Sequence, residues 1–260
     1  MATSTGKSQL RLRVFAGPNG SGKSTIIKEV ANTVIDGKKI DLGTYINADD
    51  IAFALLKNKF SFNTYKITTS KKEVVAFAVS SGLLNSSFTQ LQLNNSFTLS
   101  NGDLKLKQLT AREQLAQILA RFLRECMLKE KRRFSFETVF SHPSNLDIMR
   151  QAAAAGYKVY LYFVSTESPE INKYRVKLRV EQKGHDVPEN KIESRYYRSL
   201  ALLYDAAEIA YQVFFFDNSG ESYKLVNHFK KQGDKKMWDT QNQKEFTEWF
   251  KKYYWNKRKP

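Results

Sequence analysis

Apolar residues fall in two patterns along the chain, one typical of strands and one typical of helices. Leu10, Leu12 and Val14 alternate with polar residues, which is the period of a half-buried strand. Between Leu115 and Leu123 the apolar spacing is three and four residues, which gives a helix one apolar face. Along the whole chain, these patterns predict strands at residues 10–15, 44–47, 134–139, 159–165 and 212–216, with helices between them.

This alternation of strands and helices predicts an α/β fold with a mainly parallel sheet, because parallel strands need crossover connections. Ser144 and Asp147 have the spacing of a capping box, which predicts that they open the helix after the third strand. Residues 58–109 interrupt the alternation and are rich in Asn, Ser, Thr, Lys and Phe. They predict an inserted polar segment with a hairpin whose turn lies near Asn101-Gly102.

The last residues of the chain have a composition of their own. Residues 233–260 are basic and aromatic, and we expect a terminal amphipathic helix that packs on the core through Trp238, Phe246, Trp249, Phe250 and Tyr253. The predicted organisation is therefore a main domain over residues 1–232, with an insertion at about 58–109, and an extension over 233–260.

Composition narrows the class of protein. The 260 residues are 42% apolar and 13% aromatic, which is enough for a core. The formal charge of +16 favours anionic partners such as nucleotides, sugar phosphates, nucleic acid or membrane surfaces. We find no run of about 18 apolar residues and no apolar signal region near the N-terminus, so we expect a cytoplasmic protein. Cys126, the single cysteine, shares a helical face with Leu115 and Leu119 and is interpreted as core packing.

Residues 17–24, GPNGSGKS, match the phosphate-binding motif G-x-x-x-x-G-K-[ST]. A predicted strand precedes the motif and a predicted helix follows it, which is the order that a P-loop requires. Glycines let successive backbone N–H groups point at phosphate oxygens, and the helix N-terminus adds a partial positive charge. The predicted triphosphate-binding residues are Gly17, Pro18, Asn19, Gly20, Ser21, Gly22, Lys23, Ser24 and Thr25. Lys23 would contact the β- and γ-phosphates of ATP, and the Ser24 hydroxyl would bind Mg²⁺.

Ligands of open α/β sheets lie at the carboxyl ends of the strands. Three predicted strands end in acidic residues, at Asp49, Glu137 and Asp217. One of them could hold the metal ion, for which Glu137 is the candidate beside Ser24, and another could take a proton from an acceptor hydroxyl. Asp49 is the candidate general base, with Asp50 as a first-turn acid. The alternative for this pair is helix capping alone.

Arginines follow the fourth strand. Arg175 and Arg179 are four residues apart and share a helical face, and a second predicted helix carries Arg195 and Arg198. Arginines on a lid helix can neutralise the charge that spreads over the γ-phosphate during phosphoryl transfer. Solvated surface arginines are the alternative for any one of them.

The P-loop, YINADDI, FSFETVFS, GYKVYLYFVS and RVKLRVEQKGHDVPENKIESRYYRSL occur in this order. In these stretches the chain resembles the zeta-toxin family of P-loop kinases, in its chromosomal branch, over roughly residues 10–60 and 110–230. The resemblance implies a three-layer P-loop NTPase sandwich with a helical lid. It also implies transfer of the γ-phosphoryl group of ATP to a hydroxyl, with UDP-N-acetylglucosamine as the best-known acceptor, and an antitoxin partner.

Carried onto this chain, the family's catalytic aspartate falls on Asp49, and its substrate-contacting acidic position falls on Glu137, followed by Thr138. One lid arginine falls on Arg179, with Arg175 one turn away. His185 aligns with the second lid arginine, and Arg195 is the candidate substitute. This departure affects the acceptor more than the ATP chemistry, since the P-loop residues are intact.

Two other functions remain open on the sequence. The charge and the aromatic tail suggest a nucleic-acid end kinase or an RNA-associated ATPase, and residues 58–109 could make the chain a nucleotide-dependent interaction module. We expect neither a GTPase nor a hydride-transfer enzyme. The chain has no N-K-x-D element that would select guanine, and its glycines do not follow G-x-G-x-x-G.

Overall fold

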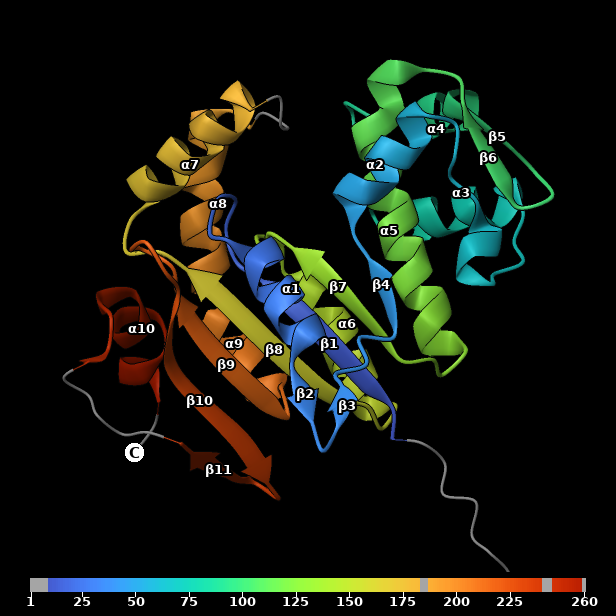
Figure 1. Ribbon diagram of the computed structural model, residues 1–260. Helices are drawn as coiled ribbons and strands as arrows, with labels where there is room; N and C mark the ends of the chain where they lie inside the picture. The colour runs from blue at the N-terminus through green and yellow to red at the C-terminus, as the bar shows by residue number, and fades with distance from the viewer. Residues whose placement is uncertain (1–8, 183–186, 240–244, 259–260) are drawn as a thin grey trace, which may run out of the picture. The chain divides into compact units, whose positions relative to one another are not determined.

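The computed structural model describes residues 9–182, 187–239 and 245–258 (Figure 1). The chain divides into two compact units. The first consists of Met1–Gly43 and Ser135–Pro260, and the second of Thr44–Phe134. The P-loop belongs to the first unit, which is described first.

One twisted sheet organises the first unit. Its strands lie in the order β11 (Lys235–Trp238), β10 (Lys224–Gln232), β9 (Gln212–Asp217), β8 (Lys158–Ser165), β1 (Arg11–Ala16) and β7 (Phe134–Thr138). Both β1 and β9 pair in parallel with β8, whereas β10 pairs antiparallel with β9 and with β11. The four strands predicted for this part of the chain are confirmed as β1, β7, β8 and β9.

Helices cover both faces of this sheet. Figure 1 shows α1 on one face and α6 and α9 on the other. The helices of the unit are α1 (Lys23–Asn32), α6 (Ser144–Ala154), α7 (Pro169–Glu181), α8 (Glu189–Ala201), α9 (Leu203–Ile209) and α10 (Glu248–Tyr253), and a short hairpin joins β2 (Val34–Ile35) to β3 (Lys38–Lys39). The predicted three-layer α/β fold with a mainly parallel sheet is thus confirmed.

Helix α6 begins where the sequence predicts, but not through a capping box. Pro143 occupies the cap position, and Ser144 is already inside the helix. The Ser144 hydroxyl lies 2.8 Å from Nδ1 of His142, and Asp147 pairs with Arg150 at 3.1 Å. The predicted capping box is therefore wrong, because a residue inside the first turn cannot cap that turn.

The C-terminal residues complete the sheet and its core. Trp238 pairs with Phe229 across β10 and β11, so the expectation that it shares a helix with Phe246 is wrong. In place of one long terminal helix, the structure has the short helix α10, followed by a 3₁₀ turn at Trp255–Lys257. Trp249 and Phe250 are buried, as expected for packing on the core. The domain boundary predicted at 232/233 falls in the turn between β10 and β11 and stays a prediction.

The second unit is helical with one small sheet. Its elements are β4 (Thr44–Ile46), α2 (Ala48–Leu56), a 3₁₀ turn at Phe62–Tyr65, α3 (Lys71–Ser80), α4 (Gln90–Ser96), β5 (Phe97–Ser100), β6 (Asp103–Leu106), a 3₁₀ turn at Leu109–Ala111 and α5 (Arg112–Lys129). Leu115, Leu119 and Leu123 on α5 are fully buried, as their spacing predicts.

Cys126 on the same helix is half-buried, and burial raises the pKa of its thiol to about 11. The thiol is thus protonated near neutral pH and unreactive.

The hairpin predicted in residues 58–109 is confirmed. Strands β5 and β6 pair antiparallel on either side of Asn101-Gly102. Both turn residues have positive φ, 51° and 84°, as a two-residue type I′ turn requires. Asn63 Nδ2 donates to Asn101 O at 2.8 Å, and Phe62 N donates to Gly102 O at 2.8 Å, so this segment folds on itself rather than forming an open loop.

No helix within residues 9–182, 187–239 and 245–258 has both the length and the apolar character needed to cross a bilayer.

If the C-terminal residues belong to the core, Phe250→Ala should lower the free energy of unfolding by about 3–5 kcal/mol, because it leaves a cavity beneath a fully buried ring. Met237→Ala is the matched change, since Met237 lies on β11 with 53% of its surface exposed. It should alter stability by no more than about 0.5 kcal/mol. Denaturant unfolding measures both. Equal effects would show that the C-terminal segment adds nothing to the core.

Candidate active site

The P-loop joins β1 to α1 in a conformation that only glycine allows at two positions. Gly17 has φ 144°, and a Cβ built there would lie 2.0 Å from Val164 O on β8. Gly22 has φ 92°, and its Cβ would lie 2.1 Å from Asn218 Nδ2. The loop can therefore approach the carboxyl ends of β8 and β9 only because these side chains are missing.

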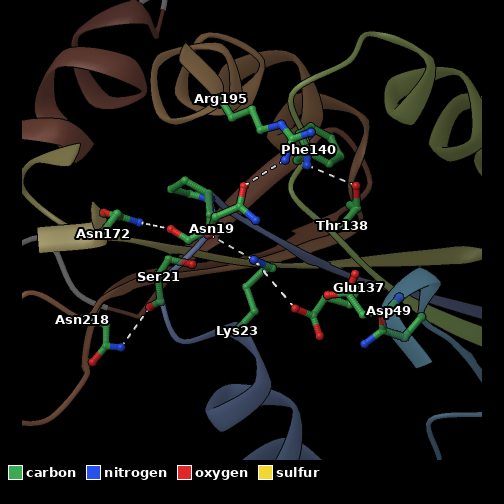
Figure 2. Close-up of polar contacts among 12 residues, drawn as sticks. Asn19, Ser21, Lys23, Asp49, Glu137, Thr138, Phe140, Asn172, Arg195 and Asn218 are labelled. Atoms are coloured by element: carbon green, nitrogen blue, oxygen red, sulfur yellow. Dashed lines mark hydrogen bonds and ion pairs between the residues drawn. The ribbon is translucent and has the colours of Figure 1, made fainter. Parts of the chain in front are cut away.

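Two asparagines hold the P-loop from outside. Asn172, in α7, donates its amide to Asn19 O and accepts from the hydroxyl of Thr166. Asn218, just after β9, donates to Ser21 O at 2.9 Å. Figure 2 shows both amides directed at the loop backbone. They fix two carbonyls of the loop and so hold its backbone in one conformation.

Lys23 is the first residue of α1, directly after the loop, and 6% of its surface is exposed. Its Nζ is 3.0 Å from Pro18 O and 3.7 Å from Glu137 Oε1 at the end of β7 (Figure 2). A buried ammonium group needs such partners, because its desolvation is costly. The Glu137 side chain is also largely buried, with 15% of its surface exposed. The structure therefore brings together two residues that the sequence predicts for the site.

The start of α1 suits an anion. Gly22 caps the helix without a side-chain hydrogen bond, and the first turn contains no acidic residue. The partial positive charge of the helix N-terminus is thus not neutralised by the chain itself. Among the described residues, the buried Ser21 Oγ has no hydrogen-bond partner. An uncapped helix, a buried lysine and an unsatisfied hydroxyl fit a phosphate chain.

The donor set for a metal ion is small. Among the described residues, no three His, Cys, Asp or Glu side chains are grouped closely enough to hold a metal. The hydroxyl of Ser24, which is exposed, and the carboxylate of Glu137 are hard oxygen ligands. Mg²⁺ commonly takes one or two such ligands and completes its shell with phosphate oxygens and water. These residues therefore fit Mg²⁺ bound together with a nucleotide better than a metal bound alone.

The turn after β7 has a strained residue next to a predicted substrate contact. Phe140 is fully buried with φ 59°, a conformation that costs a non-glycine residue about 1–2 kcal/mol. Its N–H donates to Thr138 Oγ1 at 3.1 Å, and that hydroxyl donates to Asn145 Oδ1 at 3.3 Å. The hydrogen bond from Phe140 N offsets part of this strain. The same bond helps to hold the Thr138 hydroxyl in one orientation.

The lid arginines differ in their surroundings. Arg175 donates to Asn218 O at 2.5 Å and to Gly220 O at 3.0 Å, so its guanidinium supports the loop after β9. Arg195 Nη1 donates to Asn19 Oδ1 at 3.5 Å (Figure 2). Arg179 is exposed in the last turn of α7. His185 lies outside the described residues.

Asp217, the last residue of β9, is held by neighbouring hydrogen-bond donors. Its Oδ1 accepts from Ser219 N at 3.0 Å, and its Oδ2 accepts from Ser219 Oγ at 2.9 Å and from Trp249 Nε1 at 2.8 Å. The group is 7% exposed. Donors on both oxygens of a buried carboxylate favour a structural role for Asp217, and its convergence with the other two acids stays a prediction.

Asp49 belongs to the second unit. Asn47 caps α2, and its side chain accepts from Asp49 N at 2.9 Å. Asp49 and Asp50 lie in the first turn and are exposed. Asn47, rather than Asp49 or Asp50, therefore occupies the cap position of this helix. The assignment of Asp49 as general base stays a prediction.

Two supports of the site were not found from the sequence. Asn172 lies in an ordinary stretch of α7, and Trp249 lies 32 residues beyond Asp217. No motif marks either residue, because each acts through a contact that only the folded chain creates. Asn218 could be placed near the site, since it follows a predicted strand.

Replacing Gly22 tests the close approach of the P-loop to Asn218. Gly156→Ala, at φ 84° with no atom within 4 Å of the new Cβ, should cost about 1 kcal/mol in the free energy of unfolding. Gly22→Ala should cost a further ~1–3 kcal/mol, because the Cβ must displace the Asn218 amide. Denaturant unfolding compares the two variants, and equal costs would contradict this geometry.

The fold resembles those of several solved structures. The crystal structure of the AvrRxo1-ORF1:AvrRxo1-ORF2 complex with sulphate ions aligns with a TM-score of 0.50 at 14% identity. The same complex with ATP aligns with a TM-score of 0.51 at 14% identity. Each alignment covers 89% of this chain and 61% of the other, so this chain spans less than two thirds of that protein. At this level of identity, the comparison shows that this chain and those structures have a similar fold.

The PezAT chromosomal toxin–antitoxin system of Streptococcus pneumoniae aligns with a TM-score of 0.48 at 11% identity, over 98% of this chain and 84% of that one. No curated protein sequence matches the chain. The family model described as Zeta toxin matches residues 102–242, which is more than half of the 260 residues. The chain belongs to the zeta toxin family.

Proposed function

We propose that this zeta toxin family member is an ATP-dependent kinase that transfers the γ-phosphoryl group to a hydroxyl of a small molecule. The observation that carries the proposal is Lys23, a buried ammonium group held between Pro18 O and Glu137 at the uncapped start of α1. This arrangement provides both the charge and the backbone geometry that a triphosphate needs.

ATP is the proposed donor for two reasons. The family membership favours a kinase, and a structurally similar complex, AvrRxo1-ORF1:ORF2, has been crystallised with ATP. Gly17, Pro18, Asn19, Gly20, Ser21, Gly22, Lys23, Ser24 and Thr25 would surround the phosphates. Ser24 and Glu137 would hold Mg²⁺, which supplies charge neutralisation at the β- and γ-oxygens when bound.

In the proposed reaction the acceptor oxygen forms a bond to the γ-phosphorus. The bond between that phosphorus and the β–γ bridging oxygen breaks, ADP leaves, and Asp49 takes the proton of the hydroxyl. Lys23 stabilises the charge on the phosphate oxygens, and Arg179 is the proposed lid cation, with Arg195 as the second. Arg175, which donates to two carbonyls, would act mainly by supporting the loop after β9.

By resemblance, the proposed acceptor is a nucleotide sugar such as UDP-N-acetylglucosamine. Glu137, Thr138, Asp49 and His185 are the residues that would contact it. The fixed hydroxyl of Thr138 supports this role, because a hydrogen-bonding side chain that is already oriented loses little entropy on binding.

A protein partner is also proposed. The structurally similar AvrRxo1-ORF1 was crystallised as a complex with AvrRxo1-ORF2, and PezAT is a toxin–antitoxin system. We propose that this chain is a toxin that binds an antitoxin protein.

The nucleic-acid alternative rests on the charge of +16 and on the aromatic, basic tail. Phe246, Trp249, Phe250 and Tyr254 are each less than 5% exposed, so these four rings offer no free face on which bases could stack. Three further rings of the tail, at Trp238, Tyr253 and Trp255, are partly exposed. The small-molecule acceptor is therefore the better supported proposal.

Substituting the two neighbouring aspartates tests the general base. Asp49→Asn should lower kcat about 10²–10⁴-fold, because an amide cannot accept the hydroxyl proton. Asp50→Asn changes the adjacent exposed carboxylate of the same helical turn and should leave turnover near the wild-type value. The acceptor is first identified by a metabolite screen for an ATP-dependent mass gain of one phosphate group. Full turnover in Asp49→Asn would reject this base.

The lid arginine is tested in the same assay. Arg179→Gln should lower kcat about 10²–10³-fold, because one donor to the transition-state charge is lost. Arg198→Gln is the control, since Arg198 is also exposed and its Nε donates to Ser194 O within its own helix. If both variants lose activity equally, the effect is one of general surface charge and Arg179 has no specific role.

A further inference from the structure

The C-terminal segment, residues 245–258, contacts the turn that follows β9. This turn, residues 217–220, is called the β9 turn below. Trp249 Nε1 donates to Asp217 Oδ2 at 2.8 Å, and both residues are buried. The indole N–H therefore completes the hydrogen bonding of a buried carboxylate, which otherwise depends on Ser219 alone among the described residues.

The β9 turn contacts the P-loop from its other side. Asn218 Nδ2 donates to Ser21 O at 2.9 Å. The same nitrogen lies where a Cβ on Gly22 would be, so the amide fills the space beside the last residue of the loop. Any shift of the β9 turn would move this amide and release one carbonyl of the P-loop.

A second connection reinforces the first. Glu248 N, in the first turn of α10, donates to Glu167 Oε1 at 3.1 Å. Glu167 N donates in turn to Ser219 Oγ at 2.8 Å. Helix α10 is thus tied to the β9 turn both directly and through the residues that follow β8.

Helix α10 is itself firmly held by packing. The ring centroid of Trp249 lies 6.0 Å from that of Phe163 on β8, and Phe250 packs edge to face on Phe215 of β9 at 4.8 Å. Trp249 is 2% exposed and Phe250 is fully buried. A rigid helix of this kind can transmit its position to the turn it contacts.

We propose that Trp249 is a positioning residue for the phosphate loop, acting through Asp217 and Asn218. The C-terminal segment is then a structural component of the nucleotide site through the β9 turn. The significance for ATP rests on the proposed function, whereas the coupling of Trp249 to the P-loop does not.

Trp249→Phe tests the coupling without nucleotide. It keeps an aromatic ring in the same packing and removes the N–H donor to Asp217. Amide hydrogen exchange in the P-loop peptide, residues 17–25, should become faster, by about fivefold for one lost hydrogen bond. Tyr254→Phe is the matched control, because it also keeps a buried ring and removes one hydroxyl, which accepts from Lys236. It should leave exchange in this peptide unchanged.

The order of the contacts is tested by a double substitution. Asn218→Ala should speed exchange in residues 17–25 by itself, since it removes the donor to Ser21 O. Adding Trp249→Phe to Asn218→Ala should then have little further effect, because the two side chains act in series. Additive effects, or unchanged exchange in Trp249→Phe alone, would overturn the proposal.

Nucleotide binding separates this inference from the proposed function. Calorimetry with Mg²⁺ and ATP should show a Kd about fivefold higher for Trp249→Phe than for the wild type and Tyr254→Phe. If the wild type bound no ATP while exchange still responded to Trp249→Phe, the kinase proposal would fail and the coupling would stand. If ATP bound the wild type and Trp249→Phe equally well, the role of Trp249 in the nucleotide site would be rejected.

Discussion

The close approach of the P-loop backbone to the ends of β8 and β9 is the constraint on which the candidate site depends. Gly17 lies against Val164 O and Gly22 lies against the Asn218 amide, at separations that no Cβ could occupy. Because the loop is held this tightly, its N–H groups are oriented before any ligand arrives, and binding a phosphate chain needs little further ordering. Lys23 follows from the same geometry. It is buried because the loop closes over it, and it is therefore paired with Pro18 O and Glu137.

Where a local pattern specifies the structure, the sequence was sufficient. The predicted strands that became β1, β7, β8 and β9 are short apolar runs between helices, and the hairpin at Asn101-Gly102 follows from two residues that tolerate positive φ. The C-terminal strands could not be found in this way. Between Leu225 and Asn227 the register of β10 against β9 shifts, which breaks the alternation that marks a strand. Without a recognisable strand before it, Trp238 is grouped by spacing with the aromatics of the helix that follows, although it lies on β11.

The site shows the same division between local and tertiary information. The P-loop motif identifies Lys23 and Ser24 because its spacing is a local requirement of phosphate binding. The motif gives no such information for Asp217, because a carboxylate after a strand is compatible with catalysis and with structure, and only the contact with Trp249 favours structure. Asn172 was missed for a related reason. Its contribution to the site is a hydrogen bond to the P-loop backbone, 153 residues away in the sequence. An asparagine in a helix carries no sequence pattern that predicts such a contact.

The position of the C-terminal segment also changes what the charge of +16 implies. A basic, aromatic tail that projects from a domain is a natural surface for nucleic acid, since free rings and cations act together. Here the rings of Trp249, Phe250 and Tyr254 are buried, and some cations are engaged by the chain itself, as Lys236 is by Glu208. The remaining surface charge attracts anions without selecting among them. Selection must then come from the few cations whose position is fixed. Lys23 is the clearest of these, because its burial lets it act on one phosphate chain at short range, where attraction is strongest.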